Sequence, residues 1–230
     1  MSPGALPLDV VGEQLWLLPS GAVWWPASHT LFAADLHLGK GAAFRAQGQP
    51  VPRGSSANTL GRLRAELVAQ DAQRLVVLGD FWHGPAGVTA ALLNEVAALV
   101  QDFDTLLVLG NHDRFAHRGD AARLPLRAEL GPLALGGLWA AHEPAAAEAP
   151  GFTLAGHVHP AVWLGSRAGD QLRRPCFVHQ RQGLVLPAFG SLTGSWVLRP
   201  QEYAAQGAAV AVLGADTVRW LPHSGALRSP

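Results

Sequence analysis

Carboxylate, carboxamide and imidazole side chains recur at the ends of short apolar segments along this chain. They stand in five groups, which are Asp35-Leu36-His37, Gly79-Asp80, Gly110-Asn111-His112-Asp113, His142 and Gly156-His157-Val158-His159. Oxygen and imidazole donors without a thiolate suit Mn, Fe or Zn in a catalytic site, whereas structural zinc sites are usually rich in cysteine. The residue types therefore predict a hydrolytic centre that holds two divalent metal ions.

The segments that precede these groups have the length and composition of buried strands. They are residues 30–34, 74–78, 105–109, 137–141 and 152–155. A short apolar run that ends at Gly or a polar residue is typical of a buried strand. Because ligands of open α/β sheets gather at the carboxyl ends of strands, we expect the five groups to form one site.

The spacing within the groups indicates how they would share two metal ions. Residues i and i+2 can converge on one ion, as Asp35 with His37 and His157 with His159 would. Two ions about 3.5–4 Å apart need a group that touches both, and the carboxylate of Asp80 is the candidate. Each group alone is more typical of a turn or a helix cap, but the ordered set favours a metal site.

Two helices are expected between the first three of these strands. One follows a cap at Ser55 or Ser56, and the other covers residues 88–100. Their apolar faces would be Leu60, Leu63, Leu67 and Val68 in the first, and Leu92, Leu93, Val96 and Leu99 in the second. The Gly- and Pro-rich segment 39–54 is interpreted as an irregular loop. Alternating strands and helices predict parallel pairing through crossover connections.

The pattern changes after residue 130, where short strands recur at turn-sized spacing. We interpret this half as antiparallel meanders that form a second sheet, and residues 15–25 as a hairpin. Two sheets packed face to face with helices outside would make an α/β fold, an αββα sandwich of two mixed sheets. We expect one domain over residues 1–222 and a loose tail over 223–230.

Composition limits the classes of protein that remain. The chain has 17 basic and 17 acidic side chains, so no net charge attracts nucleic acid to the molecule as a whole. The longest apolar runs are strand-sized, and no membrane span or signal peptide is expected. The single cysteine, Cys176, cannot form an internal disulfide, which fits the reducing cytoplasm, and it is expected to be a buried small hydrophobe.

The motifs resemble those of the calcineurin-like metallophosphoesterases, and the match spans Asp35 to His159 without a substitution in any of the five groups. The resemblance implies two ligand sets that share one residue. These sets are Asp35, His37, Asp80 and His159 for one metal, and Asp80, Asn111, His142 and His157 for the other.

The same resemblance implies a mechanism. A hydroxide that bridges the metals would attack phosphorus, without a covalent intermediate. His112 would be a catalytic acid, oriented by Asp113. The implied cofactors are two divalent ions, Mn²⁺ first, with Fe or Zn as alternatives.

Sequences around the five groups resemble a narrower bacterial branch, the ligase-associated DNA damage response endonuclease PdeM family. Matching segments include 35–40, 50–52, 79–83, 141–144, 155–160 and 186–190. This resemblance implies a Mn-dependent DNA endonuclease or phosphodiesterase. It also implies association in DNA repair with an ATP-dependent DNA ligase, a helicase and a metallo-β-lactamase-type nuclease.

Several basic and aromatic side chains would contact the substrate in that case. The candidates for phosphate are Lys40, Arg45, Arg53, Arg114 and Arg118, with His83 as a further substrate contact and Phe44 or Trp82 as a stacking partner for a base. The alternatives are a solvated loop and core aromatic residues. Arg173, Arg174 and Arg181 are interpreted as surface charges, with the lining of a nucleic-acid groove as the alternative.

Two other functions remain open at this stage. The same chemistry would serve a phosphodiesterase or phosphatase for small nucleotides. A catalytically inactive binding scaffold is less consistent with the sequence, because every ligand position is filled. The oligomeric state is also open, with a dimer as one alternative.

Overall fold

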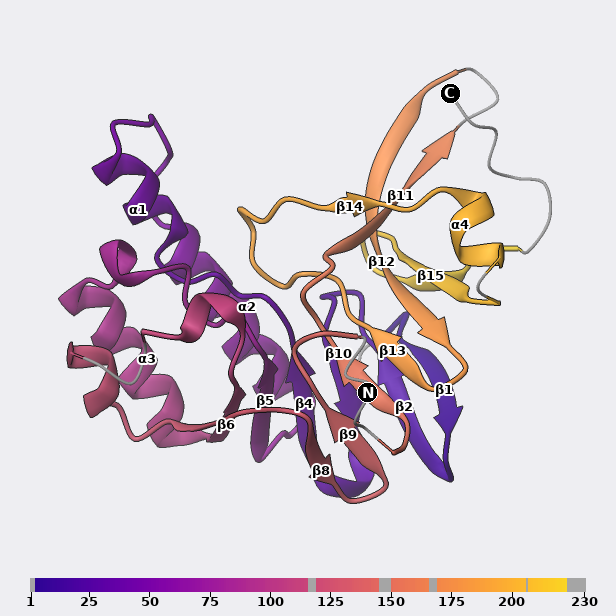
Figure 1. Cartoon of the computed structure of the whole chain (residues 1–230), viewed down its shortest axis with the longest axis horizontal. Helices are drawn as coiled ribbons and strands as arrows, with labels where there is room; N and C mark the ends of the chain where they lie inside the picture. The colour runs from indigo at the N-terminus through magenta and orange to yellow at the C-terminus, as the bar shows by residue number, and fades with distance from the viewer. Residues whose placement is uncertain (1–2, 116–118, 145–149, 166–168, 206, 223–230) are drawn as a thin grey trace.

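Two β-sheets pack face to face in the computed structural model, and helices cover their outer faces (Figure 1). The structure describes residues 3–115, 119–144, 150–165, 169–205 and 207–222. The chain therefore has the predicted αββα sandwich of two mixed sheets. The expected tail over residues 223–230 lies outside the described residues.

The first sheet has its strands in sequence order, antiparallel from β1 to β4 and parallel from β4 to β7. Its strands are β1 (Leu6–Val10), β2 (Glu13–Leu17), β3 (Val23–Trp25), β4 (Thr30–Ala33), β5 (Arg74–Leu78), β6 (Asp104–Val108) and β7 (Arg127–Glu129). The predicted hairpin is confirmed as β2 and β3. Helix α2 (Ser55–Ala69) joins β4 to β5, and α3 (Ala90–Asp102) joins β5 to β6, as the strand–helix alternation predicts.

The second sheet is mixed, and this corrects the expectation of antiparallel meanders. Strand β10 pairs in parallel with both β9 and β13, and β11 pairs in parallel with β14. Short spacing between strands does not fix their direction, because neighbours in this sheet are often not consecutive in the chain. The strands are β8 (Leu133–Leu135), β9 (Leu138–Ala140), β10 (Thr153–Ala155), β11 (Pro160–Gly165), β12 (Gln171–Gln180), β13 (Gly183–Val185), β14 (Trp196–Val197), β15 (Ala209–Leu213) and β16 (Val218–Trp220).

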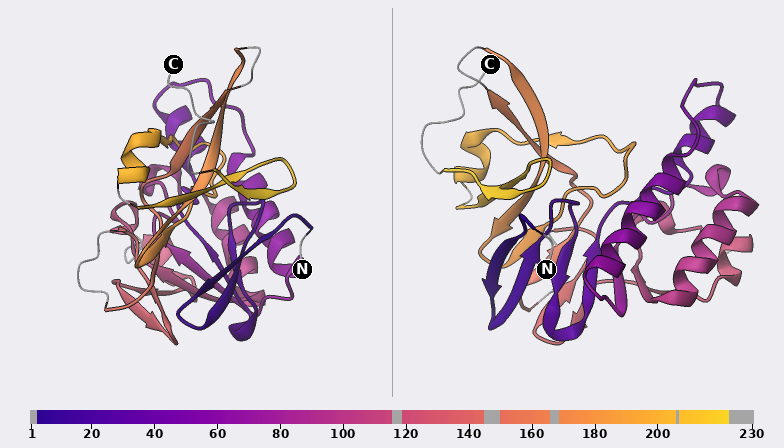
Figure 2. Two further views of the ribbon diagram at one scale, coloured as in Figure 1. Left: turned by 90° about the vertical axis from the view of Figure 1, so that its right-hand side faces the viewer. Right: turned by 180° about the vertical axis from the view of Figure 1, so that it is seen from behind.

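Alternation along the strands divides the core into three layers. In β4, Phe32 faces the second sheet, while Leu31 and Ala33 face helices α2 and α3. A third layer lies under α4 (Pro200–Ala205) and contains the fully buried Cys176 of β12, as the sequence predicts. Figure 2 shows α1 (Lys40–Ala46), α2 and α3 on one side of the molecule and α4 on the other.

Helix α1 corrects the interpretation of residues 39–54 as wholly irregular. It lies within that segment and begins after Gly39, which adopts the left-handed conformation that glycine tolerates. The structure also corrects the predicted cap of α2: the helix begins at Ser55 with Gly54 as its N-cap, and the Ser56 hydroxyl accepts a hydrogen bond from the Gly39 N–H instead. Val68 is 67% exposed and does not belong to the buried face.

Short 3-10 turns complete the described structure: η1 (Pro26–Ser28), η2 (Pro85–Gly87), η3 (Asn111–Asp113) and η4 (Gly119–Arg123). Among the described residues, we find no helix with the length and apolar character needed to cross a membrane.

Candidate metal centre

Every predicted ligand lies within four residues of the carboxyl end of a strand, in a loop or, for Asn111, at the start of η3. Asp35 and His37 follow β4, Asp80 follows β5, Asn111 follows β6, His142 follows β9, and His157 and His159 follow β10. Backbone hydrogen bonds join these loops: the His37 N–H donates to the Asp80 carbonyl at 2.9 Å, and the Gly156 N–H donates to the His142 carbonyl at 3.0 Å. Strands from both sheets therefore bring their carboxyl ends to one place.

The loops hold several ligands in a sparsely populated backbone conformation. Asp35, His37, Asp80, His157 and His159 all have positive φ, between 45° and 69°. For residues with a side chain, this left-handed region costs about 1 kcal/mol or more at each position. Such strain persists where the surrounding structure enforces it, as it often does at functional sites.

Asp35, His37 and His159 form a first group of donor atoms. The Nε2 atoms of His37 and His159 lie 3.4 Å apart, and Asp35 Oδ1 lies 3.4 Å from His159 Nε2. The other ring nitrogen of His159, Nδ1, lies 3.1 Å from the carbonyl of Gly194, to which it donates as Nδ1–H. That bond leaves the lone pair of His159 Nε2 facing the group.

Asn111, His142 and His157 form a second group. His142 Nε2 lies 2.9 Å from Asn111 Oδ1 and 3.0 Å from His157 Nδ1. The Nδ1 atom of His142 lies 3.1 Å from the carbonyl of Leu78, so its N–H has a partner and the Nε2 lone pair points at the group.

Asp80 lies between the two groups. Its Oδ2 is 3.6 Å from His37 Nε2, and its Oδ1 is 3.6 Å from His142 Nε2. Asp35 also approaches both groups, but its Oδ1 lies 4.0 Å from His142 Nδ1, the nitrogen that the Leu78 carbonyl already occupies. Asp80 is therefore the better candidate for a shared ligand.

This donor set fits a pair of divalent cations. Donor atoms of Asp35, His37 and His159, and likewise those of Asp35, Asp80 and His142, lie within 4.8 Å of one another. Burial, followed by the neighbouring positive charges of which His159 is the largest, lowers the pKa of His37 to about 2, so its ring is neutral at pH 7. Burial also acts against the charged form of His159, but the hydrogen bond and charge of Asp35 leave its pKa raised.

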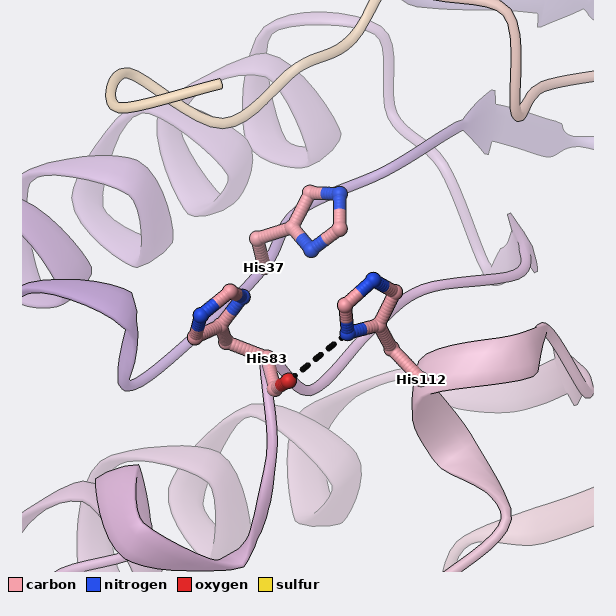
Figure 3. A group of neighbouring side chains, drawn as sticks. All are labelled: His37, His83 and His112. Atoms are coloured by element: carbon pink, nitrogen blue, oxygen red, sulfur yellow. Dashed lines mark hydrogen bonds between the residues drawn. The ribbon is translucent and has the colours of Figure 1, made fainter. Parts of the chain in front are cut away.

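His112 borders the first group, and its donor atom lies within 4.8 Å of those of His37 and His83. Figure 3 shows the rings of His37, His83 and His112 close together, with the His112 ring bonded to the His83 backbone oxygen. The His112 Nδ1–H donates to that carbonyl at 2.8 Å, and the His83 ring stacks on the His112 ring with centroids 5.3 Å apart. The remaining nitrogen, Nε2, is the one left for proton transfer.

The family comparison agrees with this geometry. A model of the calcineurin-like phosphoesterases matches residues 28–170, which contain every ligand described above. The chain is a calcineurin-like phosphoesterase. It is therefore a metal-dependent hydrolase, as the residue types predict.

Among solved structures, this phosphoesterase is similar to nuclease MPE of Pseudomonas putida. The two sequences are 34% identical over 94% of this chain and 100% of that one, with a TM-score of 0.74. YfcE, a phosphoesterase from E. coli, is 15% identical over 84% of this chain and 97% of that one, with a TM-score of 0.43. None of the curated proteins that were compared matches the chain.

Asp113 has different partners from those that the resemblance implies. Its buried carboxylate accepts backbone N–H groups of Phe81, Trp82 and Gly110 at 2.9–3.3 Å, and the His112 ring contacts the His83 carbonyl instead. Burial raises the pKa of Asp113 to about 6, although these N–H bonds act in the opposite direction. The side chain therefore joins the loops after β5 and β6, and any effect on His112 is indirect.

The Asp113→Ala variant of this phosphoesterase should be destabilised by about 3 kcal/mol, because it leaves buried N–H groups without an acceptor. Urea denaturation followed by circular dichroism measures the change in the free energy of unfolding. The exposed Asp9→Ala variant is the control and should unfold like the wild type. An unchanged midpoint for Asp113→Ala would show that these hydrogen bonds do not hold the loops.

The Gly79→Ala variant should disrupt the metal centre. Gly79 has φ 79°, and an added Cβ would overlap the His142 imidazole. We expect loss of at least one bound metal ion per chain, measured by elemental analysis of purified protein. Gly61→Ala is the matched control, because a Cβ there meets nothing within 4 Å. Full metal content in Gly79→Ala would contradict the close packing of Gly79 against His142.

The predicted substrate contacts differ in where the structure places them. Lys40 lies close enough to Asp80 for that carboxylate to act on its pKa, which burial nevertheless lowers. The guanidinium of Arg45 donates to the carbonyls of Val51 and Pro52, so its described contacts stabilise its own loop. Arg53 and Arg114 are exposed. Arg118 lies outside the described residues.

Trp82 is not a stacking partner for a base. Its side chain is fully buried in the layer between the first sheet and the helices, which corrects that expectation. The aromatic ring of Phe44 remains half-buried and contacts His83 edge-on at 5.8 Å.

Sequence reasoning missed the backbone carbonyls that orient the imidazoles. The carbonyls of Leu78, His83 and Gly194 each bond to a ring nitrogen, and a backbone atom leaves no mark in a residue pattern. The Gly- and Ser-rich segment 190–195 was the available signal for Gly194, since turn-forming residues after a strand indicate a loop at the same sheet edge.

Proposed function

We propose that this phosphoesterase is a two-metal phosphodiesterase that cleaves DNA internally and acts in DNA repair. The observation that carries the proposal is the position of Asp80, with one carboxylate oxygen toward each group of donor atoms. The similarity to Pseudomonas putida nuclease MPE supports a polynucleotide substrate. The resemblance to the PdeM family supports Mn²⁺ and a functional link to a DNA ligase, a helicase and a second nuclease. The single cysteine, Cys176, supports a place in the reducing cytoplasm.

The side chains around the centre have distinct roles in this hydrolysis. When bound, two divalent cations neutralise phosphate charge and lower the pKa of a coordinated water. Lys40 adds a positive charge beside Asp80, where it can attract a phosphate oxygen. His112, held through its Nδ1–H by the His83 carbonyl, can donate a proton from Nε2 to the departing alkoxide.

Cleavage of circular single-stranded DNA tests the proposal. A circle has no ends, so only internal cleavage makes it linear. We expect linear product from the wild type with Mn²⁺ and none from Asp80→Asn. An intact circle, incubated with wild-type protein shown to carry metal, would overturn the endonuclease proposal.

The second candidate is hydrolysis of small nucleotide diesters or monoesters, which the formal net charge of zero favours. Turnover of a dinucleotide or mononucleotide, by protein that leaves the circle intact, would support it. An inactive scaffold is the third candidate, and the complete ligand set argues against it. Purified protein without any specific metal would support the scaffold.

Removal of metal should abolish hydrolysis reversibly. Dialysis against EDTA should reduce turnover of bis(p-nitrophenyl) phosphate to background, because the ligand carboxylates and imidazoles cannot replace the cations. Addition of Mn²⁺ should restore the rate, and a parallel series with Fe²⁺ and Zn²⁺ ranks the metals. Turnover that survives complete removal of metal would contradict the assignment of Asp80 and the histidines as ligands.

A further inference from the structure

A cavity of about 350 Å³ lies beside the metal centre, on the side of His159. Its wall includes His159 itself, Arg62 of α2, Arg173 and Arg174 of β12, and residues from the segment 188–195. We call it the arginine cavity. His159 is the one predicted metal ligand among the residues that line this cavity, so the cavity adjoins the metal centre.

The arginine cavity has a positive wall although the chain as a whole has no net charge. Three arginine side chains border it, and none of the described residues that line it is acidic. Serine and threonine residues of the segment 188–195 add neutral hydrogen-bond donors. Positive charge with neutral donors is the composition that a phosphate backbone requires.

Arg62 is held in place before any ligand binds. Its guanidinium lies over the Phe189 ring at 4.6 Å and donates to the Ser20 carbonyl at 3.4 Å. Partial burial lowers its pKa, which Glu66 partly offsets, but a guanidinium stays charged at neutral pH. An ordered cation loses little entropy when a phosphate binds.

An exposed tryptophan, Trp163, lies on the face of the β11–β12 ribbon that lines the arginine cavity. Strands β11 and β12 form an antiparallel ribbon that projects from the sheets (Figures 1 and 2). Ala161 pairs with Pro175, and both line the arginine cavity. Trp163 pairs with Arg173 two residues along, so it shares that face, and its side chain is 43% exposed.

We propose that the arginine cavity and Trp163 bind the single strand of a polynucleotide that extends from the cleaved phosphate. Arg62 and Arg173 contact its phosphates, and Trp163 stacks on an unpaired base. A paired duplex keeps its bases stacked on each other, so the site favours a single strand. The inference rests on the proposed function, since it extends the substrate of the same metal centre.

Binding and turnover measured on the same variants test the inference. The probe is a fluorescein-labelled oligothymidylate of about 12 nucleotides, whose affinity is measured by anisotropy in EDTA to prevent cleavage. The variants are Arg62→Gln with Arg173→Gln, Trp163→Ala alone, and Arg181→Gln as the matched control. Arg181 is an exposed arginine in the turn after β12, and it does not border the cavity. Turnover of bis(p-nitrophenyl) phosphate with Mn²⁺ reports on folding and on the metal centre.

We expect the double variant to bind oligothymidylate at least about 10-fold more weakly and Trp163→Ala about 10-fold more weakly. The slope of log affinity against log salt should become about 1.4 less steep in the double variant, since two phosphate contacts are lost. Turnover of the small diester should stay within about twofold, because it does not reach the arginine cavity. Arg181→Gln should match the wild type in both assays.

Wild-type affinity in both variants, or equal loss in Arg181→Gln, would overturn the inference. If the cavity variants lost small-diester turnover as much as they lost binding, the inference would also be overturned, since that result indicates damage to the metal centre. A different result would contradict the proposed function: the wild type would turn over the small diester but leave circular DNA intact. In that case the anisotropy data would still test, independently of cleavage, whether the arginine cavity binds a single strand.

Discussion

The Asp80→Asn variant should lose at least about 10³-fold in turnover while it keeps the fold. An amide is neutral and offers one oxygen, so it cannot contact a cation on each side as a carboxylate does. It also leaves two neighbouring cations less well neutralised. The Asp80 Oδ1 atom accepts the His112 N–H at 3.0 Å, and an asparagine oxygen can keep that bond. The loop after β6 should therefore remain in place.

Three measurements on Asp80→Asn separate chemistry from folding. These are the rate with bis(p-nitrophenyl) phosphate, the metal content and the far-ultraviolet circular dichroism. Asp104→Asn is the control, because Asp104 is exposed at the start of β6 and pairs with Arg74. A rate within tenfold of the wild type for Asp80→Asn would remove the two-metal mechanism.

Much of the fold follows from local pattern. The apolar runs of β4, β5 and β6 are buried on both faces, so a sequence without polar interruption predicts a central parallel strand. The second sheet was predicted less well, because parallel pairing of β9, β10 and β13 depends on contacts between distant segments. Helix α1 was missed since Gly and Pro at its flanks obscure a short helical segment.

In the site too, features that follow from the local sequence could be predicted, whereas features that depend on contacts between distant segments could not. Ligand types and their strand-end positions are local, and the structure brings Asp35, His37, Asp80 and His142 together as expected. The partners of Asp113 are backbone atoms of other loops, which a sequence does not display. The arginine cavity could not be predicted from the sequence either, since α2, the β11–β12 ribbon and the segment 188–195 meet only in the folded chain.

The His112→Ala variant should slow cleavage according to the leaving group. With a dinucleotide, whose alkoxide must be protonated, we expect a loss of about 100-fold to 10,000-fold in turnover. With bis(p-nitrophenyl) phosphate the loss should be below about tenfold, because p-nitrophenolate leaves without a proton. Metal content should be unchanged, since His112 belongs to neither predicted ligand set and the backbone N–H that Asp80 accepts is retained in alanine.

The comparison between leaving groups identifies the role of His112 better than the size of either loss. A residue that only maintains the shape of the site would slow both substrates alike. His29→Ala is the control, because His29 is an exposed histidine before β4, at the opposite end of that strand from Asp35. Equal losses for both leaving groups in His112→Ala would assign His112 to positioning. The proton for the alkoxide would then come from another group, and Lys40, which lies close to Asp80, is the candidate.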